Sequence, residues 1–231
     1  TCLSGDYDSL KIPEYLDNEV DYVCYSDCPK DGYGVWDVRS YLPAINDDTR
    51  LSRHPKILPH LYLKGYETSL YIDANVLPIV SLIPLIKKFE KSEKIVAGIK
   101  HPWRNCIYDE GNACIKSNKD SKEKIEEALS YYKTQGYPKK YGLNENNFII
   151  RKHNHPNIIK TMEIWWDVYS KYSKRDQLSY NFALFLSKIE AAEILLGEGK
   201  HVRNVAEFFY FSHQKEDIWV NPLSKHATGE K

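Results

Sequence analysis

The chain has 231 residues, enough for one large domain or two small ones with a sizeable core. Its 32 Lys and Arg residues balance 32 Asp and Glu residues, and a formal net charge of zero excludes a non-specific nucleic-acid binder, which needs a basic surface. The longest apolar run, near residues 76–86, contains Pro78 and Pro84 and is too short to span a bilayer, so we expect no membrane span.

Short apolar runs alternate with amphipathic stretches, a pattern typical of the α/β class. Asp120 is the expected N-cap of one helix, and Ser173 with Asp176 fits the capping pattern of another. We interpret the chain as one domain cut from a longer protein, since it opens within a strand and without Met, and we expect a frayed tail at 221–231. In chain order, the pattern predicts a strand at 22–26, a helix at 51–63, strands at 69–72 and 94–99, a helix at 120–135, a strand at 147–151, and helices at 156–172 and 174–196.

The cysteines are odd in number and irregularly spaced, which argues against a disulfide framework and against a zinc site. We expect mostly reduced thiols, with one bridge between Cys106 and Cys114 left open. Reduced thiols favour a cytoplasmic location. The five are Cys2, Cys24, Cys28, Cys106 and Cys114.

The segment SLYIDANV ends an apolar strand with two oxygen-bearing side chains, Asp73 and Asn75. Side chains two apart on an extended segment point the same way. At the end of a buried strand they can hold Mg²⁺ or Mn²⁺, with phosphate oxygens completing the coordination. The alternative is an Asx turn that closes the strand, and the letters DAN alone favour that turn.

Two polar loops near the N-terminus are candidates for binding a nucleotide. In TCLSGDYDSL, Gly5 lets backbone approach a ligand, while Asp6, Tyr7 and Asp8 offer polar groups and a ring. In DYVCYSD, Asp27 ends the strand and can accept a hydrogen bond from a base or ribose. The alternatives are an ordinary loop for the first segment and a turn cap for the second.

A basic helix face is predicted in RLSRHPKILPH, where Arg53 and Lys56 are three residues apart. Cations beside a metal–phosphate site would add to its charge stabilisation, whereas the alternative is a solvated basic face.

Two further segments suit the recognition of sugars. KHPWRNCIYDE places Trp103 and Arg104 after a strand, and GLNENNFIIRKHN places Glu145 and Asn146 just before one. The face of a Trp ring stacks on a sugar ring, and charged or amide groups form hydrogen bonds with the sugar hydroxyls. The alternatives are a loop with Trp103 tucked into the core and a polar turn.

The segment YSKRDQLSYNFAL places Arg175, Asp176 and Gln177 at a helix start, where Asp176 can act as a general base toward an acceptor hydroxyl. The alternative for Asp176 is a helix cap, which does not exclude catalysis. His213, in FFYFSHQ, can close a metal shell as a nitrogen ligand, although a lone His is more often structural.

Seven segments, in this order, resemble the plant seed-mucilage glycosyltransferase-like family, long labelled a domain of unknown function, with bacterial and viral relatives. They are SGDYDSL, DYVCYSD, LSRHPKILPHLYL, YETSLYIDANV, KHPWRNCIYDE, ENNFIIRKHN and SKRDQLSYNFAL. The resemblance runs from Gly5 to about His213. It implies a GT-A fold, with a central mixed, mostly parallel sheet flanked by helices.

The resemblance also assigns roles. It implies a divalent metal at a D-x-D-like motif matched by Asp73 and Asn75, with His213 where a C-terminal ligand is expected. It further implies a nucleotide loop over residues 5–8, a basic helix with Arg53 and Lys56, and a late acceptor-side motif over residues 175–177. Asn75 departs from the usual second acid, which removes a negative charge from the metal shell.

We therefore expect a Mn²⁺- or Mg²⁺-dependent glycosyltransferase that moves a sugar from a nucleotide sugar, UDP-sugar first, to a glycan or other hydroxyl acceptor. An inverting displacement is slightly favoured. The main alternative is a non-catalytic carbohydrate-binding or scaffold domain with a degenerate metal motif. A nucleotide-sugar hydrolase or phosphotransferase is a further alternative, and the plant relatives suggest the Golgi lumen as the alternative location.

Overall fold

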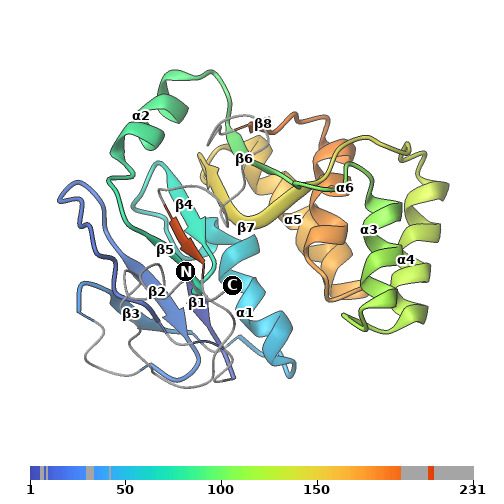
Figure 1. Ribbon diagram of the computed structural model, residues 1–231, viewed down its shortest axis with the longest axis horizontal. Helices are drawn as coiled ribbons and strands as arrows, with labels where there is room; N and C mark the ends of the chain where they lie inside the picture. The colour runs from blue at the N-terminus through green and yellow to red at the C-terminus, as the bar shows by residue number, and fades with distance from the viewer. Residues whose placement is uncertain (6–7, 9, 30–33, 42, 194–207, 211–231) are drawn as a thin grey trace, which may run out of the picture.

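The structure is a computed structural model that describes residues 1–5, 8, 10–29, 34–41, 43–193 and 208–210 (Figure 1). Strands and helices alternate along the described chain, so the predicted α/β class is confirmed. The strands are β1 Cys2–Leu3, β2 Val23–Ser26, β3 Asp37–Ser40, β4 Ser69–Ile72, β5 Val76–Pro78, β6 Val96–Lys100, β7 Asn144–Arg151, β8 Ala192–Glu193 and β9 Phe208–Tyr210. The helices are α1 Asp48–Ile57, the short 3₁₀ helix η1 Pro59–Leu61, α2 Ile83–Lys91, α3 Ile107–Lys116, α4 Lys122–Thr134, α5 Pro156–Lys171 and α6 Gln177–Ser187.

The strands form three small sheets rather than one mostly parallel sheet, so that part of the expectation is wrong. β1, β2 and β3 form a parallel sheet, and β5 pairs with β9 antiparallel. The largest sheet has the order β4-β7-β6-β8, in which β7 is antiparallel to both neighbours and only the β6–β8 pair is parallel. β7 thus lies at the centre of this sheet and meets both β4 and β6.

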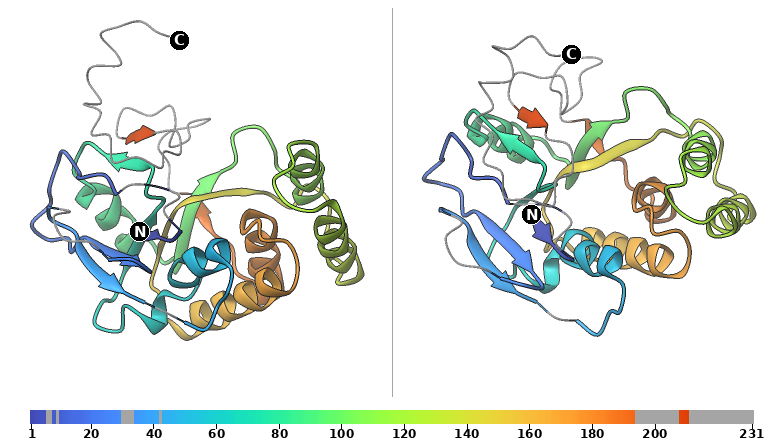
Figure 2. Two further views of the ribbon diagram at one scale, coloured as in Figure 1. Left: turned by 90° about the horizontal axis from the view of Figure 1, so that it is seen from below. Right: turned by 60° about the horizontal axis from the view of Figure 1, so that its bottom comes forward.

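Helices α1, α5 and α6 form a layer beside the sheets, and α2 lies apart from them (Figure 1). α5 packs on α6, and α1 packs against both β1 and α5. The pair α3 and α4 lies on the far side of α5 and α6 from the β1–β3 sheet (Figure 1, Figure 2). In the described part of the chain, no helix is long and apolar enough to cross a membrane.

Helix α1 begins three residues earlier than predicted because Asp47 is its N-cap, with the side chain accepting a hydrogen bond from Arg50 N at 2.9 Å. It ends at Ile57, before Pro59 opens η1, since a proline cannot donate to continue the helix. At α4 the predicted cap Asp120 is wrong, because Ser121 accepts from Lys124 N instead.

The predicted helix 174–196 is too long, and its predicted cap residue Ser173 is also wrong. α6 begins after Asp176, whose side chain accepts from Gln177 N, and it ends at Ser187. Lys188 adopts a left-handed conformation with φ 55°, and Ile189 N donates back to Leu184 O. This C-terminal motif usually uses Gly, so Lys188 gave no stop signal in the sequence.

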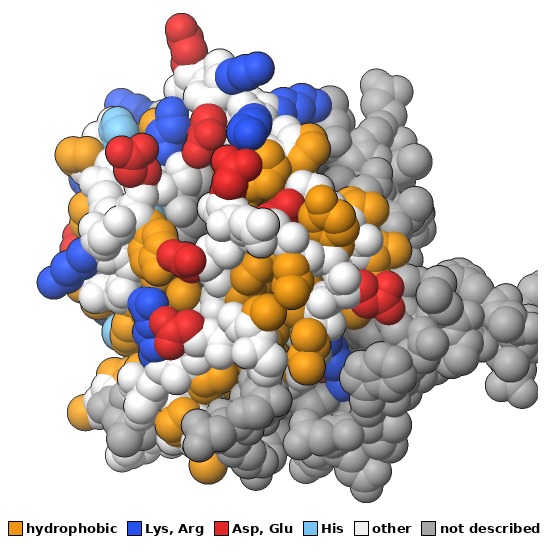
Figure 3. Space-filling model, turned by 90° about the vertical axis from the view of Figure 1, so that its left-hand side faces the viewer, with side chains coloured by type: hydrophobic (Ala, Val, Ile, Leu, Met, Phe, Trp, Pro, Cys, Tyr) orange, Lys and Arg blue, Asp and Glu red, His pale blue; other side chains and the backbone are white. Residues whose placement is uncertain are grey.

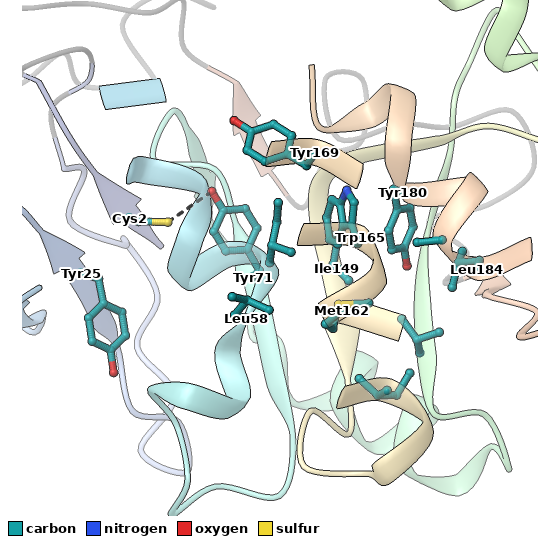
Figure 4. Close-up of a cluster of buried hydrophobic side chains, with 14 of the residues drawn as sticks. Cys2, Tyr25, Leu58, Tyr71, Ile149, Met162, Trp165, Tyr169, Tyr180 and Leu184 are labelled. Carbon is teal, nitrogen blue, oxygen red and sulfur yellow. Dashed lines mark hydrogen bonds between the residues drawn. The ribbon is translucent and has the colours of Figure 1, made fainter. Parts of the chain in front are cut away.

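The main core cluster joins α1, α5, α6, β4 and β7 around Trp165, which is fully buried (Figure 4). The Trp165 indole N–H donates to the Asp176 carbonyl at 3.1 Å, which ties the start of α6 to this core. The helical spacing of Ile158, Met162 and Trp165 predicted α5 from the sequence, and all three side chains are fully buried.

All five cysteines are free thiols, so the possible bridge between Cys106 and Cys114 is wrong. Cys106 is the N-cap residue of α3 and Cys114 lies in its last turns. Eight residues of helix rise separate their Cα atoms by about 12 Å, which is beyond the reach of a disulfide.

Candidate functional site

Charged side chains from three separate segments meet in one cluster. Arg53 and Lys56 come from α1, Asp73 directly follows β4, and Asp176 caps α6. Lys56 Nζ lies 2.7 Å from Asp176 Oδ2 and 3.3 Å from Asp73 Oδ1. Arg53 Nε lies 3.7 Å from the same Asp176 oxygen. We call these four residues the charge cluster, and all four are residues that the sequence analysis had singled out.

Burial makes this cluster electrostatically strong. The Lys56 side chain is 2% exposed and that of Asp176 is 9% exposed. Burial acts to raise the pKa of Asp176, but the Lys56 ammonium and the Arg53 guanidinium outweigh it, with a smaller contribution from Arg175, and the pKa falls to about 2. Asp176 is therefore ionised at neutral pH and is a weak base while both cations remain beside it.

Tyr71, which was not predicted from the sequence, completes the surroundings of Asp73. Its hydroxyl donates to Asp73 Oδ1 at 2.9 Å, and its ring lies 4.7 Å from Lys56 Nζ. Cys2 Sγ lies 3.8 Å from the same hydroxyl (Figure 4). Burial first, and then the charge of Asp73, raises the pKa of Tyr71 well above its usual value, so the hydroxyl stays a donor. The available signal was the two-residue spacing, which puts Tyr71 and Asp73 on the same side of β4.

The letters DAN form a turn rather than an extended segment. Val76 N donates to Asp73 O at 2.9 Å, and β5 begins at Val76. The premise that Asp73 and Asn75 follow each other on an extended strand is therefore wrong. The Asp73 side chain is 26% exposed and faces Lys56, whereas Asn75 is 3% exposed. A turn at this place still leaves the Asp73 carboxylate partly open to a ligand.

The side chains near Asp73 limit which divalent cations can bind there. Among the described residues, no group of three or more His, Cys, Asp or Glu side chains is placed to hold a metal ion. The predicted ligand His213 lies outside the described residues. Asp73 and Asn75 offer oxygen atoms only, which suits Mg²⁺ or Mn²⁺. Since Asp73 Oδ1 already faces Tyr71 and Lys56, this donor set fits a cation whose remaining ligands are phosphate oxygens and water.

The N-terminal loop is closed by Asp27. Its Oδ2 accepts from Ser4 Oγ at 2.8 Å and from Gly5 N at 3.1 Å. Gly5 has φ +64°, and a Cβ there would lie 2.8 Å from Asp48 Oδ2, so any other residue would be strained and would displace the Asp48 side chain. Asp27 and Asp48 therefore place two carboxylates beside the backbone at Gly5. Of the other predicted loop residues, Asp8 is half-buried, and Asp6 and Tyr7 lie outside the described residues.

The first residues of β7 are held against the start of α6. Asn144 N donates to Asn181 Oδ1 at 3.0 Å, Asn181 Nδ2 donates to Asn144 Oδ1 at 2.8 Å, and Gln177 Nε2 donates to Asn144 O at 2.9 Å. Gln177, expected in an acceptor-side motif, thus fixes β7 beside Asp176. Arg175 N donates to Ser173 Oγ at 3.2 Å.

Asn146 is a buried amide beside the charge cluster. Asp73 N donates to Asn147 O at 3.0 Å, which places this part of β7 next to Asp73. Asn146 is 5% exposed, and neither of its polar side-chain atoms has a hydrogen-bond partner among the residues that the structure describes. Glu145 is also buried. Both residues lie within β7 and not in a turn before it, so the predicted strand starts three residues too late.

The loop after β6 is held by a buried acid. Glu110 of α3 is 4% exposed, and its Oε2 forms an ion pair with Arg104 and lies 3.7 Å from His101 Nε2. Trp103 N and Arg104 N both donate to His101 Nδ1, at 3.3 and 3.0 Å. Trp103 is 66% exposed, so it is not tucked into the core. Glu110 was not predicted, because its role depends on the packing of α3 against this loop.

Arg151 is a buried cation that bonds to the backbone of Lys56, and it was also not predicted from the sequence. It is 1% exposed, its Nη2 donates to the Lys56 carbonyl, and its Nη1 lies 3.1 Å from Met162 Sδ. Burial lowers the pKa of Arg151 to about 10, and no ion pair to a carboxylate is present among the residues described. Arg151 therefore fixes the last turn of α1, which carries Lys56.

A cavity of about 370 Å³ lies between the β1–β3 sheet, β4 and α2. Its walls include aromatic rings such as Tyr22, Trp36 and Tyr71, and its lining includes Glu19 and Asp21. Figure 3 shows the side of the molecule near β2, β3 and α2, where apolar side chains alternate with acidic ones. No member of the charge cluster is among the described residues that line this cavity, so it does not coincide with the predicted site.

Comparison with known proteins gives one match. The model of the family described as TOD1/MUCI70, glycosyltransferase-like domain, matches residues 30–210. No curated protein and no solved structure matches the chain. The matched range contains the whole charge cluster, β7 and the loop after β6. Gly5, Asp27 and His213 lie outside it.

Proposed function

Because the chain belongs to the TOD1/MUCI70 glycosyltransferase-like domain family, we propose that it transfers a sugar from a nucleoside diphosphate sugar to a hydroxyl of a glycan or other acceptor. The family membership carries the glycosyltransferase-like character. The choice of a diphosphate donor rests on the charges of the site, and UDP is the first nucleotide to test. A GT-A arrangement of the strands belongs to the same proposal, and it rests on the family's glycosyltransferase-like description alone.

The observation that carries the proposal is the meeting of Arg53, Lys56, Asp73 and Asp176 in one cluster. Two cations on α1 meet two carboxylates from distant positions in the sequence, one at the end of β4 and one at the N-cap of α6. A departing diphosphate gains negative charge, and fixed positive groups in a partly water-excluded place stabilise such charge. Partly exposed Arg53 is the cation best placed to reach it, while buried Lys56 fixes the two acids.

Asp73, with Asn75, is the proposed place for Mn²⁺ or Mg²⁺. Such a cation, when bound, supplies charge neutralisation for the diphosphate leaving group. Asp73 offers one partly exposed carboxylate, so we expect the cation to bind weakly without the nucleotide and tightly with it. His213 remains a proposed third ligand.

Two roles are open to Asp176, and one variant separates them. With a pKa of about 2, Asp176 acts in this state as the anchor of Lys56 and Arg53 rather than as a ready base. If Asp176 anchors the cations, Asp176→Asn weakens nucleotide binding together with transfer. If Asp176 is the general base of an inverting reaction, Asp176→Asn binds nucleotide normally and loses transfer.

Sugar recognition is assigned to β7 and the loop after β6. A buried amide without a partner is costly, and a sugar hydroxyl would supply that partner to Asn146. Glu145 and Arg104 lie on the same two segments. We expect Asn146→Ala to weaken binding of the nucleotide sugar while leaving binding of the free nucleotide unchanged.

The decisive experiment is calorimetric titration of UDP, GDP and UDP-sugars, each with and without Mn²⁺. We expect the wild type to bind one nucleotide in a metal-dependent manner and Asp73→Ala to weaken this binding tenfold or more. Asp109→Ala is the matched control, because Asp109 is an exposed acid on α3 outside the charge cluster. A wild type that binds no nucleotide with Mn²⁺ would contradict the proposal.

Asn75 favours one alternative function, a carbohydrate-binding domain without turnover. The second acid of the metal motif is absent, and the two carboxylates of the cluster already face two cations. This alternative predicts oligosaccharide binding without metal-dependent nucleotide binding, so the same titrations decide between the two.

A further inference from the structure

Two exposed aromatic rings stand on neighbouring loops at the edge of the candidate site. Trp103 is 66% exposed in the loop after β6, and Tyr141 is 47% exposed in the loop before β7. The loops are joined by backbone hydrogen bonds, from Gly142 N to Asn105 O at 3.0 Å and from His101 N to Leu143 O at 2.8 Å. The two loops therefore lie side by side, and Figure 1 shows that their backbones run between the β6–β7 pair and the α3–α4 pair.

Both rings contact neighbouring aromatic rings, of which His101 and Tyr137 are largely buried. The Trp103 backbone donates to His101, whose ring lies edge-on to the indole with a centroid distance of 5.8 Å, and His101 is fixed by Glu110. Tyr141 contacts Tyr137 and Phe185 edge-to-face, each at 5.3 Å between centroids. An aromatic side chain that is already held in place loses little conformational entropy when it binds a ligand. These two rings are therefore suited to bind a flat apolar surface.

The chemistry of the surroundings fits a carbohydrate chain. A pyranose ring has an apolar face that packs on an aromatic ring, and hydroxyl edges that need hydrogen-bonding groups. Lys100 is exposed at the end of β6, Asn105 is exposed on the same loop as Trp103, and Lys140 is exposed beside Tyr141. Two separated rings among polar groups do not make the large apolar patch that a stable protein interface requires.

The position of the rings connects them to the proposed catalytic site. Gly142 and Leu143 lead directly into Asn144, which is bound by Gln177, the residue after Asp176. Resting on the proposed function, we propose that Trp103 and Tyr141 form a platform on which the acceptor, an oligosaccharide chain, stacks its sugar rings. Trp103 thus binds the acceptor and not the donor sugar assigned to it from the sequence.

The test is binding of the labelled protein to an array of plant, bacterial and animal oligosaccharides. We expect the wild type to bind a defined class of oligosaccharide, and Trp103→Ala and Tyr141→Ala each to weaken that binding about tenfold. Trp103→Phe keeps a ring and should retain most of the affinity. Tyr15→Ala is the matched control, since Tyr15 is 48% exposed and lies far from both loops in the sequence.

Two results would overturn the platform. One is a wild type that binds no oligosaccharide on the array, and the other is binding that Trp103→Ala leaves unchanged. Nucleotide titration of the same variants separates this failure from failure of the proposed function. If metal-dependent nucleotide binding persists while oligosaccharide binding is insensitive to both rings, the acceptor lies elsewhere and the transferase proposal stands.

Discussion

Lys56 is a buried ammonium whose position depends on acids that lie far from it in the sequence. An uncompensated buried charge is strongly unfavourable, and Asp176 at 2.7 Å and Asp73 at 3.3 Å provide the compensation. Such a pair is weak evidence for high stability, since well-packed apolar residues often do as well. The partial exposure of Asp73 and Arg53 beside this pair agrees better with a role in binding charge.

The pKa of Asp176 predicts how stability changes in acid. Because the folded-state pKa is lowered to about 2, the stabilisation is present above the unfolded-state pKa near 4 and is lost as the pH falls toward 2. This contribution is on the order of 2 kcal/mol. We expect the loss in the free energy of unfolding between pH 5 and pH 2 to be smaller in Asp176→Asn than in the wild type.

Urea denaturation at several pH values measures this difference. Asp176→Asn should also be less stable at pH 7, by about 3 kcal/mol, because the substitution removes one partner of a buried ion pair. Asp109→Asn, which changes an exposed acid on α3, serves as the control. Parallel acid curves for wild type and Asp176→Asn would show that Asp176 has an ordinary pKa.

The sequence allowed the charged members of the site to be predicted, but not the neutral ones. Arg53, Lys56, Asp73 and Asp176 stood out because charged residues ended strands or opened helices in segments of a recognisable family. Tyr71 gave no such signal, since one Tyr among 18 is more often a core residue. Its partners are set by tertiary packing, which a local pattern does not contain.

At the scale of elements, β7 and α6 form the frame of the site. The Asn144–Asn181 pair exchanges two hydrogen bonds, and both residues are buried. Asn181→Ala leaves Asn144 N and Asn144 Oδ1 without these partners. Each buried polar group left unpaired costs about 1–3 kcal/mol.

We therefore expect Asn181→Ala to lower the free energy of unfolding by about 2–4 kcal/mol, measured by chemical denaturation. Ser170→Ala on α5 is the control, because Ser170 is exposed and bonds only within its own helix. A loss below 0.5 kcal/mol in Asn181→Ala would mean that α6 and β7 are held together by other contacts.

The predictability of the elements follows the strength of their local signals. α5 was predicted within one residue because Pro156 opens it and apolar residues recur at helical spacing. The end of α6 was missed because Lys188 adopts the left-handed conformation that glycine usually marks. The start of β7 was missed because Asn144, Glu145 and Asn146 are polar yet buried by contacts with α6 and β4.

At the scale of the whole molecule, the exposure of the five cysteine thiols provides a test of the described packing. Cys28 is exposed, and the other four cysteines are buried. Burial raises the pKa of Cys24 to about 12 and that of Cys114 to about 11, so these thiols are unreactive as well as covered.

We expect one fast-reacting thiol in the folded protein and five after unfolding, counted with Ellman's reagent. Cys28→Ser should abolish the fast phase and leave four thiols in denaturant. A reducing agent should leave the melting temperature unchanged, because no disulfide is present. Two or more fast thiols in the native protein would contradict the described packing.

The arrangement of strands into three sheets was beyond the reach of the sequence. Strands β4, β6 and β7 were predicted, but their order and direction depend on pairings between distant residues, such as Ser69 with Arg151. A pattern of alternating strands and helices favours parallel pairing in general. The antiparallel placement of β7 between β4 and β6 replaces that default here.

The Lys56–Asp176 pair also bears on how the protein is made. During synthesis Lys56 leaves the ribosome 120 residues before Asp176 (176 minus 56). Until then the ammonium has to stay in water, because burying it without Asp176 is unfavourable. The core around Trp165 therefore closes late, and nascent chains that stop before α6 would expose the apolar faces of α1 and α5 to chaperones.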